Sequence, residues 1–203
     1  MRIALVSLRV LATIVLGSVT MTSSGEAQGK LRGTVRMGAD FGGERVLQFT
    51  YSDGSTPEMT AGGGLVLSAG GALQAFKAGA HEVDAQINVG WKYKTIPPAS
   101  NQEASWNRFP VEALLLYRAP IGLRMGAGAA VHLGNVLEAS GATLNDRVEF
   151  KNKPGFVLHT EYVRRNFAFD VRYTLMQYEV ESGGTGTVDA NSFGAGFSIF
   201  FGR

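Results

Sequence analysis

The side chains best suited to chemistry are three histidines, His81, His132 and His159, and a set of acidic and basic residues at alternate positions. The histidines fall in different stretches, and no H-x-x-x-H pair or carboxylate-flanked pair has metal-ligand spacing. The chain has no cysteine, which excludes thiolate zinc sites and disulfides. It also has no glycine-rich phosphate-binding motif. We therefore predict no metal and no cofactor.

The acidic and basic residues alternate with apolar ones, as in the stretch from Glu82 to Lys94. Its apolar members are Val83, Ala85, Ile87, Val89, Trp91 and Tyr93. Alternation with a period of two predicts a β-strand with one apolar and one polar face. The strand exceeds the roughly 9–11 residues that a tilted strand needs to cross a bilayer.

Similar stretches recur along the chain and predict eight strands. We place them at residues 31–41, 62–76, 82–94, 106–118, 123–133, 148–163, 167–175 and 192–201. The connections alternate between long and short, and residues 95–105, 135–147 and 179–190 are expected to be loops, with residues 46–51 extending the first strand or forming a hairpin. This layout predicts an all-β fold, an eight-stranded antiparallel up-and-down transmembrane β-barrel over residues 28–203, with both termini at the short-turn rim.

Residues 1–27 read as a cleavable signal peptide that precedes the barrel. Arg2 and Arg9 provide a positive start, and residues 10–19 form an apolar segment of suitable length. Small residues at Gly25 and Ala27 predict cleavage after Ala27. A single membrane anchor is the alternative, but residues 10–19 are short for a membrane span. The formal net charge of +2 gives no support to nucleic-acid binding.

The composition of the two faces of the strands indicates which face points into the lumen and which faces the bilayer. The polar face is rich in Gly and Ala, which suits the narrow lumen of an eight-stranded barrel. On the apolar face, aromatic residues gather toward the strand ends and aliphatic residues lie between them, as at the two boundaries of a bilayer. The predicted aromatic girdle consists of Phe41, Trp91, Tyr93, Trp106, Phe109, Tyr117, Tyr162, Phe167 and Phe201.

Several charged residues are then expected inside the lumen. Arg36, Glu112 and Arg172 fall at mid-height, and Arg124, His159, Glu161 and Asp170 fall nearer the short turns. Because an unpaired buried charge is costly, we expect ion pairs that fill the lumen, with Glu112 neutralising both Arg36 and Arg172. A gate or proton-linked pore is the alternative.

The chain resembles the small eight-stranded outer-membrane β-barrel families, the OmpA/OmpX-like porin-type barrels of Gram-negative bacteria. The resemblance covers the architecture of residues 28–203, and the C-terminal residues Gly196, Ile199 and Phe201 look like the signal that such families present to the barrel-assembly machinery. It implies a monomer in the bacterial cell outer membrane, in contact with outer-membrane lipid and lipopolysaccharide.

Members of these families serve as structural proteins, adhesins, small pores or lipid A-modifying enzymes. The leading hypothesis is a structural or surface-interaction role with a side-chain-filled lumen. The alternatives are a narrow pore for small or hydrophobic solutes and a lipid A-modifying enzyme. Such enzymes present serine, histidine and an acid to the lipid, whereas His132 and His159 are predicted to face inward. We therefore predict no catalytic residues.

Overall fold

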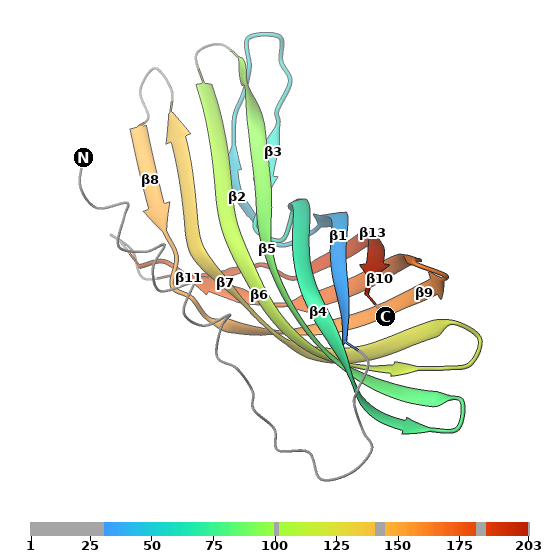
Figure 1. The fold of residues 1–203 in the computed structure, drawn as a ribbon. Helices are drawn as coiled ribbons and strands as arrows, with labels where there is room; N and C mark the ends of the chain where they lie inside the picture. Colours follow the sequence, from blue (N-terminus) through green and yellow to red (C-terminus); the bar gives the residue numbers. More distant parts are fainter. Residues whose placement is uncertain (1–30, 100–101, 141–144, 182–185, 203) are drawn as a thin grey trace.

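The computed structural model describes residues 31–99, 102–140, 145–181 and 186–202, and the expected signal peptide lies outside these residues. Figure 1 shows an all-β fold. The barrel strands are β1 (Leu31–Phe41), β4 (Gly64–Ala78), β5 (His81–Ala99), β6 (Gln102–Arg118), β7 (Leu123–Ser140), β9 (Pro154–Arg164), β10 (Phe167–Leu175) and β13 (Ser192–Phe201). Short strands β2 (Arg45–Gln48), β3 (Glu58–Thr60), β8 (Asn145–Glu149), β11 (Gln177–Glu179) and β12 (Thr187–Asp189) lie in the connections.

The eight barrel strands form a closed antiparallel ring. Each strand pairs with its predecessor and successor in the ring, and β1 pairs with β13 from Gly33 opposite Phe201 to Phe41 opposite Phe193. The predicted fold class is therefore confirmed. Within the described ranges, no helix is long and apolar enough to cross a membrane.

The outer face of the ring is apolar, as the alternation predicts. Its exposed side chains include Val35, Leu67, Ile87, Leu115, Leu158 and Val171, while the alternate residues on the same strands are buried. The polar face thus points into the lumen. Three short turns join β4 to β5, β6 to β7 and β9 to β10 at one rim, and the long connections leave from the other rim.

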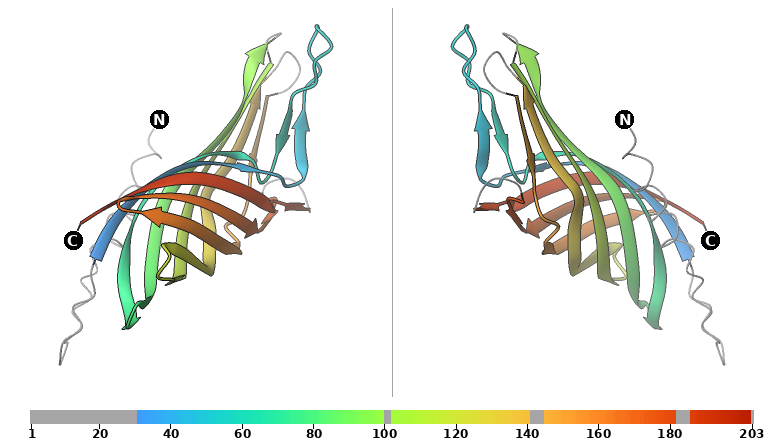
Figure 2. Two further views of the ribbon diagram at one scale, coloured as in Figure 1. Left: turned by 90° about the vertical axis from the view of Figure 1, so that its right-hand side faces the viewer. Right: turned by 90° about the vertical axis from the view of Figure 1, so that its left-hand side faces the viewer.

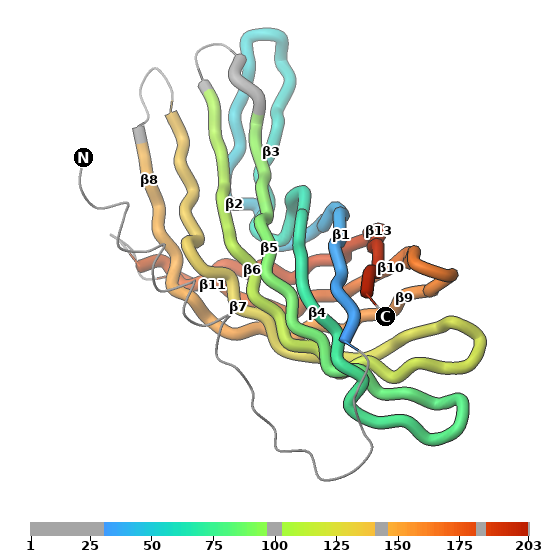
Figure 3. The backbone as a smooth tube through the Cα atoms, in the orientation of Figure 1, coloured from blue at the N-terminus to red at the C-terminus, as the bar shows by residue number. Residues whose placement is uncertain are grey.

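The strands continue well beyond the barrel at the long-connection rim. β5, β6 and β7 bend away from the ring and are extended at the edge by β8, as the tube in Figure 3 traces. We call the part of this sheet beyond Tyr93 the extension. The prediction of loops at 95–105 and 135–147 was wrong, and the predicted strand at 148–163 is divided between β8 and β9.

These segments form strands because their pairing buries apolar side chains. Ile96, Ala104 and Leu137 all point to the inner side of the extension and are buried. A register shift between Asn107 and Phe109 gives β7 an extra residue near Gly134, which has a φ of 55°. Such a β-bulge reverses the alternation along the strand, so Leu137 turns inward although Leu133 below it does not.

Two small hairpins stand beside the extension. β2 pairs with β3, so the hairpin option for residues 46–51 is the one observed. Figure 2 shows this hairpin beside the extension, at the same end of the barrel. β11 pairs with β12, and β12 lies within the segment 179–190 that was predicted to be a loop. The long-connection rim is therefore more ordered than the sequence indicated.

Candidate functional site: the lumen and its outer closure

The lumen near the short turns is organised around Asp84 on β5. Its carboxylate accepts ion pairs from Arg32 at 3.0 Å, Arg118 at 3.5 Å and Arg124 at 3.1 Å. Arg124 also pairs with Glu161. The Asp84 carboxylate and the Arg124 guanidinium are fully buried, so their charges need the compensation that these ion pairs supply.

Beside Arg124, the imidazole of His159 lies 3.4 Å from the Glu161 carboxylate. Gln86 accepts a hydrogen bond from Arg124 at 3.1 Å. The sequence prediction placed Arg124, His159 and Glu161 near the short turns, and in the structure the three side chains lie at one site. It did not identify Asp84 as the centre of that site, although the alternation placed Asp84 on the inward face.

At mid-height the lumen holds two separate ion pairs. Arg36 donates from Nε and Nη2 to Asp170, at 2.9 Å and 2.7 Å from Oδ1. Arg172 pairs with Glu112. The expectation that Glu112 neutralises both arginines needs correction, because β13 lies between β1 and β10 and brings Arg36 to Asp170 instead. All four side chains are buried.

Nearest the long connections, two buried cations bind the backbone of the segment between β3 and β4. Lys92 Nζ donates to Asp40 Oδ2 at 2.6 Å and to the Gly62 carbonyl at 2.7 Å. Arg108 donates to the carbonyls of Ala61 at 2.6 Å and Gly63 at 2.5 Å. We call residues 61–63 the strap, because inward side chains of β5 and β6 hold this segment by its backbone carbonyls.

The sequence offered a partial signal for this arrangement. Lys92 and Arg108 occupy the inward positions of their strands, and alternation finds both. Their acceptors are main-chain carbonyls of a connection, which carry no side-chain signature. Among the described residues, Arg108 makes no ion pair; its guanidinium instead lies 4.6 Å from the centre of the Trp106 ring.

An apolar cluster covers the strap from outside. Trp106, Phe150 and Tyr178 stack or tilt against one another with ring centres 5.2–5.8 Å apart. Trp106 is 0% exposed and donates from Nε1 to Asn135 Oδ1 at 2.6 Å. The placement of Trp106 in an outward girdle was therefore wrong, because its even position on β6 shares the inward face with Arg108 and Glu112.

The other girdle residues point outward. Phe41, Trp91, Phe109, Tyr117, Tyr162, Phe167 and Phe201 are exposed, and Tyr93 is half-buried against Trp91. Of the C-terminal residues, Ile199 and Phe201 are exposed on β13, and Gly196 faces the lumen. Their expected contact with the assembly machinery stays a prediction.

The histidines form no common centre. His81 Nδ1 lies 2.5 Å from the Tyr117 hydroxyl at the short-turn rim. His132 Nδ1 lies 2.5 Å from the Tyr178 hydroxyl beneath the apolar cluster. Among the described residues, no group of three or more His, Cys, Asp or Glu side chains is placed to hold a metal ion.

An apolar outer band, a closed eight-stranded ring and a polar, ion-paired lumen define a small barrel of the outer-membrane type. Solved structures support this class. The crystal structure of Ail, the attachment invasion locus protein of Yersinia pestis, matches with a TM-score of 0.52 and 12% identity, covering 86% of this chain and 100% of Ail. Ail in complex with the heparin analogue sucrose octasulfate matches with a TM-score of 0.51 at the same identity and coverage.

The outer membrane protein OprG from Pseudomonas aeruginosa matches at a TM-score of 0.47 and 13% identity, covering 88% of this chain and 99% of OprG. No family model and no curated protein sequence matches this chain. The closed ring and the two Ail matches give the fold as that of the small eight-stranded outer-membrane β-barrels.

Proposed function

We propose that this chain is an integral protein of the bacterial outer membrane that does not conduct ions and acts through its surface at the long-connection rim. The observation that carries the proposal is the position of the strap, whose carbonyls are bound by the inward-facing Lys92 and Arg108. From this position we infer that the strap closes the lumen. It is neither an enzyme nor an open pore in this proposal.

The lumen beneath the strap supports a closed barrel. An eight-stranded ring leaves just enough interior for side chains, and here that interior contains Arg36, Asp170, Arg172 and Glu112 in direct pairs. Removing one partner of such a pair leaves a buried charge uncompensated, at about 3–5 kcal/mol. A continuous water path would require these paired side chains to move apart.

The extension supports a role at the cell surface. Residues 94–99 of β5 carry the sheet about 20 Å beyond Tyr93, at roughly 3.3 Å per residue. Connections held by a rigid scaffold commonly carry the binding residues of a protein. Ail, which shares the fold, is named for attachment and invasion. A shared fold does not identify the partner of this chain.

In this proposal the chain is a monomer that the barrel-assembly machinery inserts into the membrane. The outward apolar band contacts outer-membrane lipid, and lipopolysaccharide surrounds the base of the extension. The long connections then face the exterior, and the short turns face the periplasm.

Orientation is tested with an epitope inserted at either rim. Gly54 lies at the exposed tip beyond β2, and Gly79 lies in the short turn between β4 and β5, both with open space around them. Antibody should label intact cells that carry the epitope at Gly54, and should label the Gly79 version after permeabilisation only. Labelling in the reverse order would contradict the orientation, and recovery of the protein in the soluble periplasm would contradict the location.

Closure is tested by recording from the purified chain in planar lipid bilayers. The unmodified protein should give no regular conductance steps. A variant in which residues 45–60 are replaced by a short glycine-serine linker provides the matched comparison, because it removes the β2–β3 hairpin and keeps the strap. Regular conductance steps in the unmodified protein would overturn the closed lumen and favour the narrow pore.

A further inference from the structure

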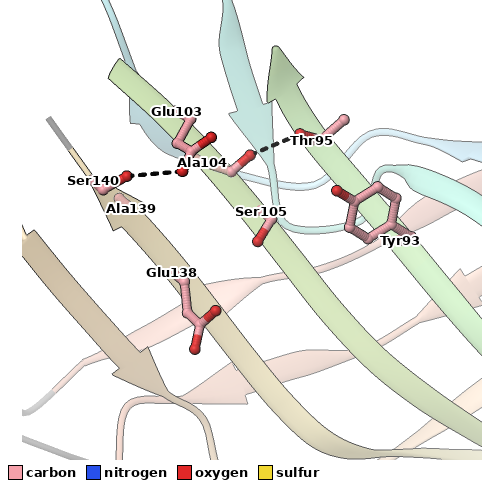
Figure 4. A pocket seen from close by; sticks show the side chains of 8 residues that line it. All are labelled: Tyr93, Thr95, Glu103, Ala104, Ser105, Glu138, Ala139 and Ser140. Carbon is pink, nitrogen blue, oxygen red and sulfur yellow. Dashed lines mark hydrogen bonds between the residues drawn. The ribbon is translucent and has the colours of Figure 1, made fainter. Parts of the chain in front are cut away.

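The outer face of the extension carries a hollow of about 330 Å³. It is lined by Tyr93, Thr95, Glu103, Ser105, Glu138 and Ser140, with two alanines (Figure 4). We call it the outer-face hollow. Its volume lies at the lower end of the range of about 300–1,000 Å³ that is usual for small-ligand sites. It lies on the face opposite the strap and the apolar cluster, so it is independent of the closure of the lumen.

The strand register brings the polar groups together. Thr95 on β5 lies opposite Ser105 on β6, and Ser105 lies opposite Glu138 on β7. One row further from the barrel, Glu103 lies opposite Ser140. Side chains two residues apart share a face of the sheet, so the two carboxylates sit on one diagonal and the two serine hydroxyls on the other.

The hydrogen bonds within the hollow leave acceptors available. Ser140 donates to Glu103 Oε1 at 3.2 Å, and Arg147 donates to Glu138 Oε1 at 3.1 Å (Figure 4 shows the first). Each carboxylate has two oxygens and about four lone-pair sites. The Ser105 hydroxyl can both donate and accept. The hollow therefore suits a ligand that carries several hydroxyl groups.

Other ligand classes fit this lining less well. A phosphate or sulfate group fits poorly, because the lining holds two carboxylates and no cation, and the adjacent Arg147 is already paired with Glu138 and Glu149. A calcium ion takes six to eight oxygen ligands, whereas within the described ranges no three acidic or histidine side chains are placed to hold a metal ion. A neutral polyhydroxyl group avoids both problems, because its hydroxyls can donate to the carboxylates and accept from Ser105.

The position of the hollow indicates where that group comes from. Tyr93 lines the end nearest the barrel and stacks on Trp91 with ring centres 5.3 Å apart. Trp91 is 44% exposed on the outer face and donates to Asn107 Oδ1 at 3.0 Å. Because Trp and Tyr side chains of this kind lie at the headgroup level of a bilayer, the hollow begins directly above the acyl chains.

We propose that the outer-face hollow binds a sugar unit of an outer-leaflet glycolipid. The sugar hydroxyls donate to Glu103 and Glu138 and accept from Ser105, and the Tyr93 ring borders the site on the membrane side. This inference rests on the proposed location in the outer membrane. Because the glycolipid is confined to the same membrane, a modest intrinsic affinity is sufficient for occupancy.

The test compares glycolipid binding by the full chain and its variants in nanodiscs. Purified lipopolysaccharide is added at increasing fractions to phospholipid nanodiscs, and bound glycolipid is counted by native mass spectrometry. Glu103→Gln with Glu138→Gln should weaken binding about tenfold, which corresponds to the loss of about 1.4 kcal/mol. Glu44→Gln with Glu58→Gln is the matched control, which removes two acidic groups at and beside the β2–β3 hairpin, and should bind as the unmodified protein does.

Equal binding by both double variants would overturn the inference. The inference would also be overturned if chelation of divalent cations removed glycolipid binding equally from the unmodified protein and both double variants. The contact would then be made through metal ions. In the unmodified protein, NMR cross-peaks between sugar protons and the Tyr93 ring are expected, and their absence with bound glycolipid would also contradict the site. The free core oligosaccharide should compete at much higher concentration than the intact glycolipid.

These outcomes are separable from a failure of the proposed function. The hollow variants should leave epitope labelling at Gly54 and the absence of conductance unchanged. If the epitope experiment placed the long-connection rim in the periplasm, the location itself would fail whatever the nanodiscs showed. If orientation held and only the glycolipid contrast was absent, the hollow alone would be wrong.

Discussion

Arg36 and Asp170, 134 residues apart in sequence, meet over the surface of the strand that separates them. β13 lies between β1 and β10, and Gly196 faces the space in which the pair forms. A Cβ atom at Gly196 would lie 2.6 Å from Arg36 Nη2 and 2.7 Å from Asp170 Oδ2. The ion pair and the glycine therefore depend on each other.

We expect Gly196→Ala to destabilise the barrel by about 1–3 kcal/mol, the range for overpacking a filled interior. The added methyl group must displace the guanidinium or the carboxylate from its partner. Gly186→Ala is the control, because a Cβ at Gly186 meets nothing within 4 Å. Reversible unfolding in lipid vesicles measures both, and equal stability of the two variants would contradict the argument.

A second prediction concerns the choice of partners at mid-height. Glu112→Ala should destabilise by about 3–5 kcal/mol because it removes the direct ion-pair partner of the buried Arg172. A double-mutant cycle with Arg172→Ala should recover part of this loss. The same cycle with Arg36→Ala should show a smaller coupling, since Arg36 pairs with Asp170. Stronger coupling of Glu112 to Arg36 than to Arg172 would contradict the observed pairing.

A third prediction tests the outer face. Ile87→Arg or Val171→Arg should cost about 2–4 kcal/mol, because these side chains, 62% and 46% exposed, lie in the middle of the apolar band. Thr187→Arg on β12 introduces the same charge at an exposed position beyond the barrel and should cost little. Unfolding in vesicles gives the comparison, and silent changes at Ile87 and Val171 would invert the assigned faces.

The contrast between the barrel and the extension shows what could be predicted from the sequence. Within the ring, alternation with a period of two determines the fold and the inward position of each charge, so the bounds of β1 and β10 were predicted as observed. Alternation does not determine which inward charges meet, because that depends on strand order and on small residues such as Gly196. The Arg36 pairing was missed for this reason.

Beyond the ring the pattern changes. The bulge at Gly134 reverses the alternation of β7, and the acceptors for Arg108 are backbone carbonyls. Polar segments with Pro97 and Pro98 look like a loop, yet their pairing buries Ile96 and Ala104. A local sequence pattern does not report burial that depends on a distant hairpin. The extension and the strap were consequently not predicted. Trp106 is a different case, because alternation along β6 already placed its even position on the inward face, and its assignment to the girdle went against that pattern.

A fourth prediction concerns pH at the surface between the end of β8 and β11. Hydrogen bonds from Lys151 and Lys153 lower the pKa of Glu179 to about 2 from an ordinary value of 4.5. The stabilisation is therefore complete above pH 4.5 and is lost as the pH falls toward 2. Carboxyl-carbon NMR of labelled Glu179 should show this low midpoint, and Lys151→Met with Lys153→Met should move it up toward 4.5. An unchanged midpoint would contradict the attribution to the two lysines.

The last prediction uses the two tryptophans, Trp91 and Trp106, as reporters of opposite faces. Trp91→Phe leaves Trp106, which is enclosed between Arg108 and the rings of Phe150 and Tyr178. Its fluorescence should resist both brominated acyl chains in the bilayer and acrylamide in the buffer. Trp106→Phe leaves Trp91, whose exposed outer-face position should make it sensitive to brominated lipid. Each variant replaces one indole by a smaller aromatic ring, so each variant is the control for the other. Strong quenching of Trp106 by brominated lipid would return it to the girdle and remove the apolar cluster from the closure of the lumen.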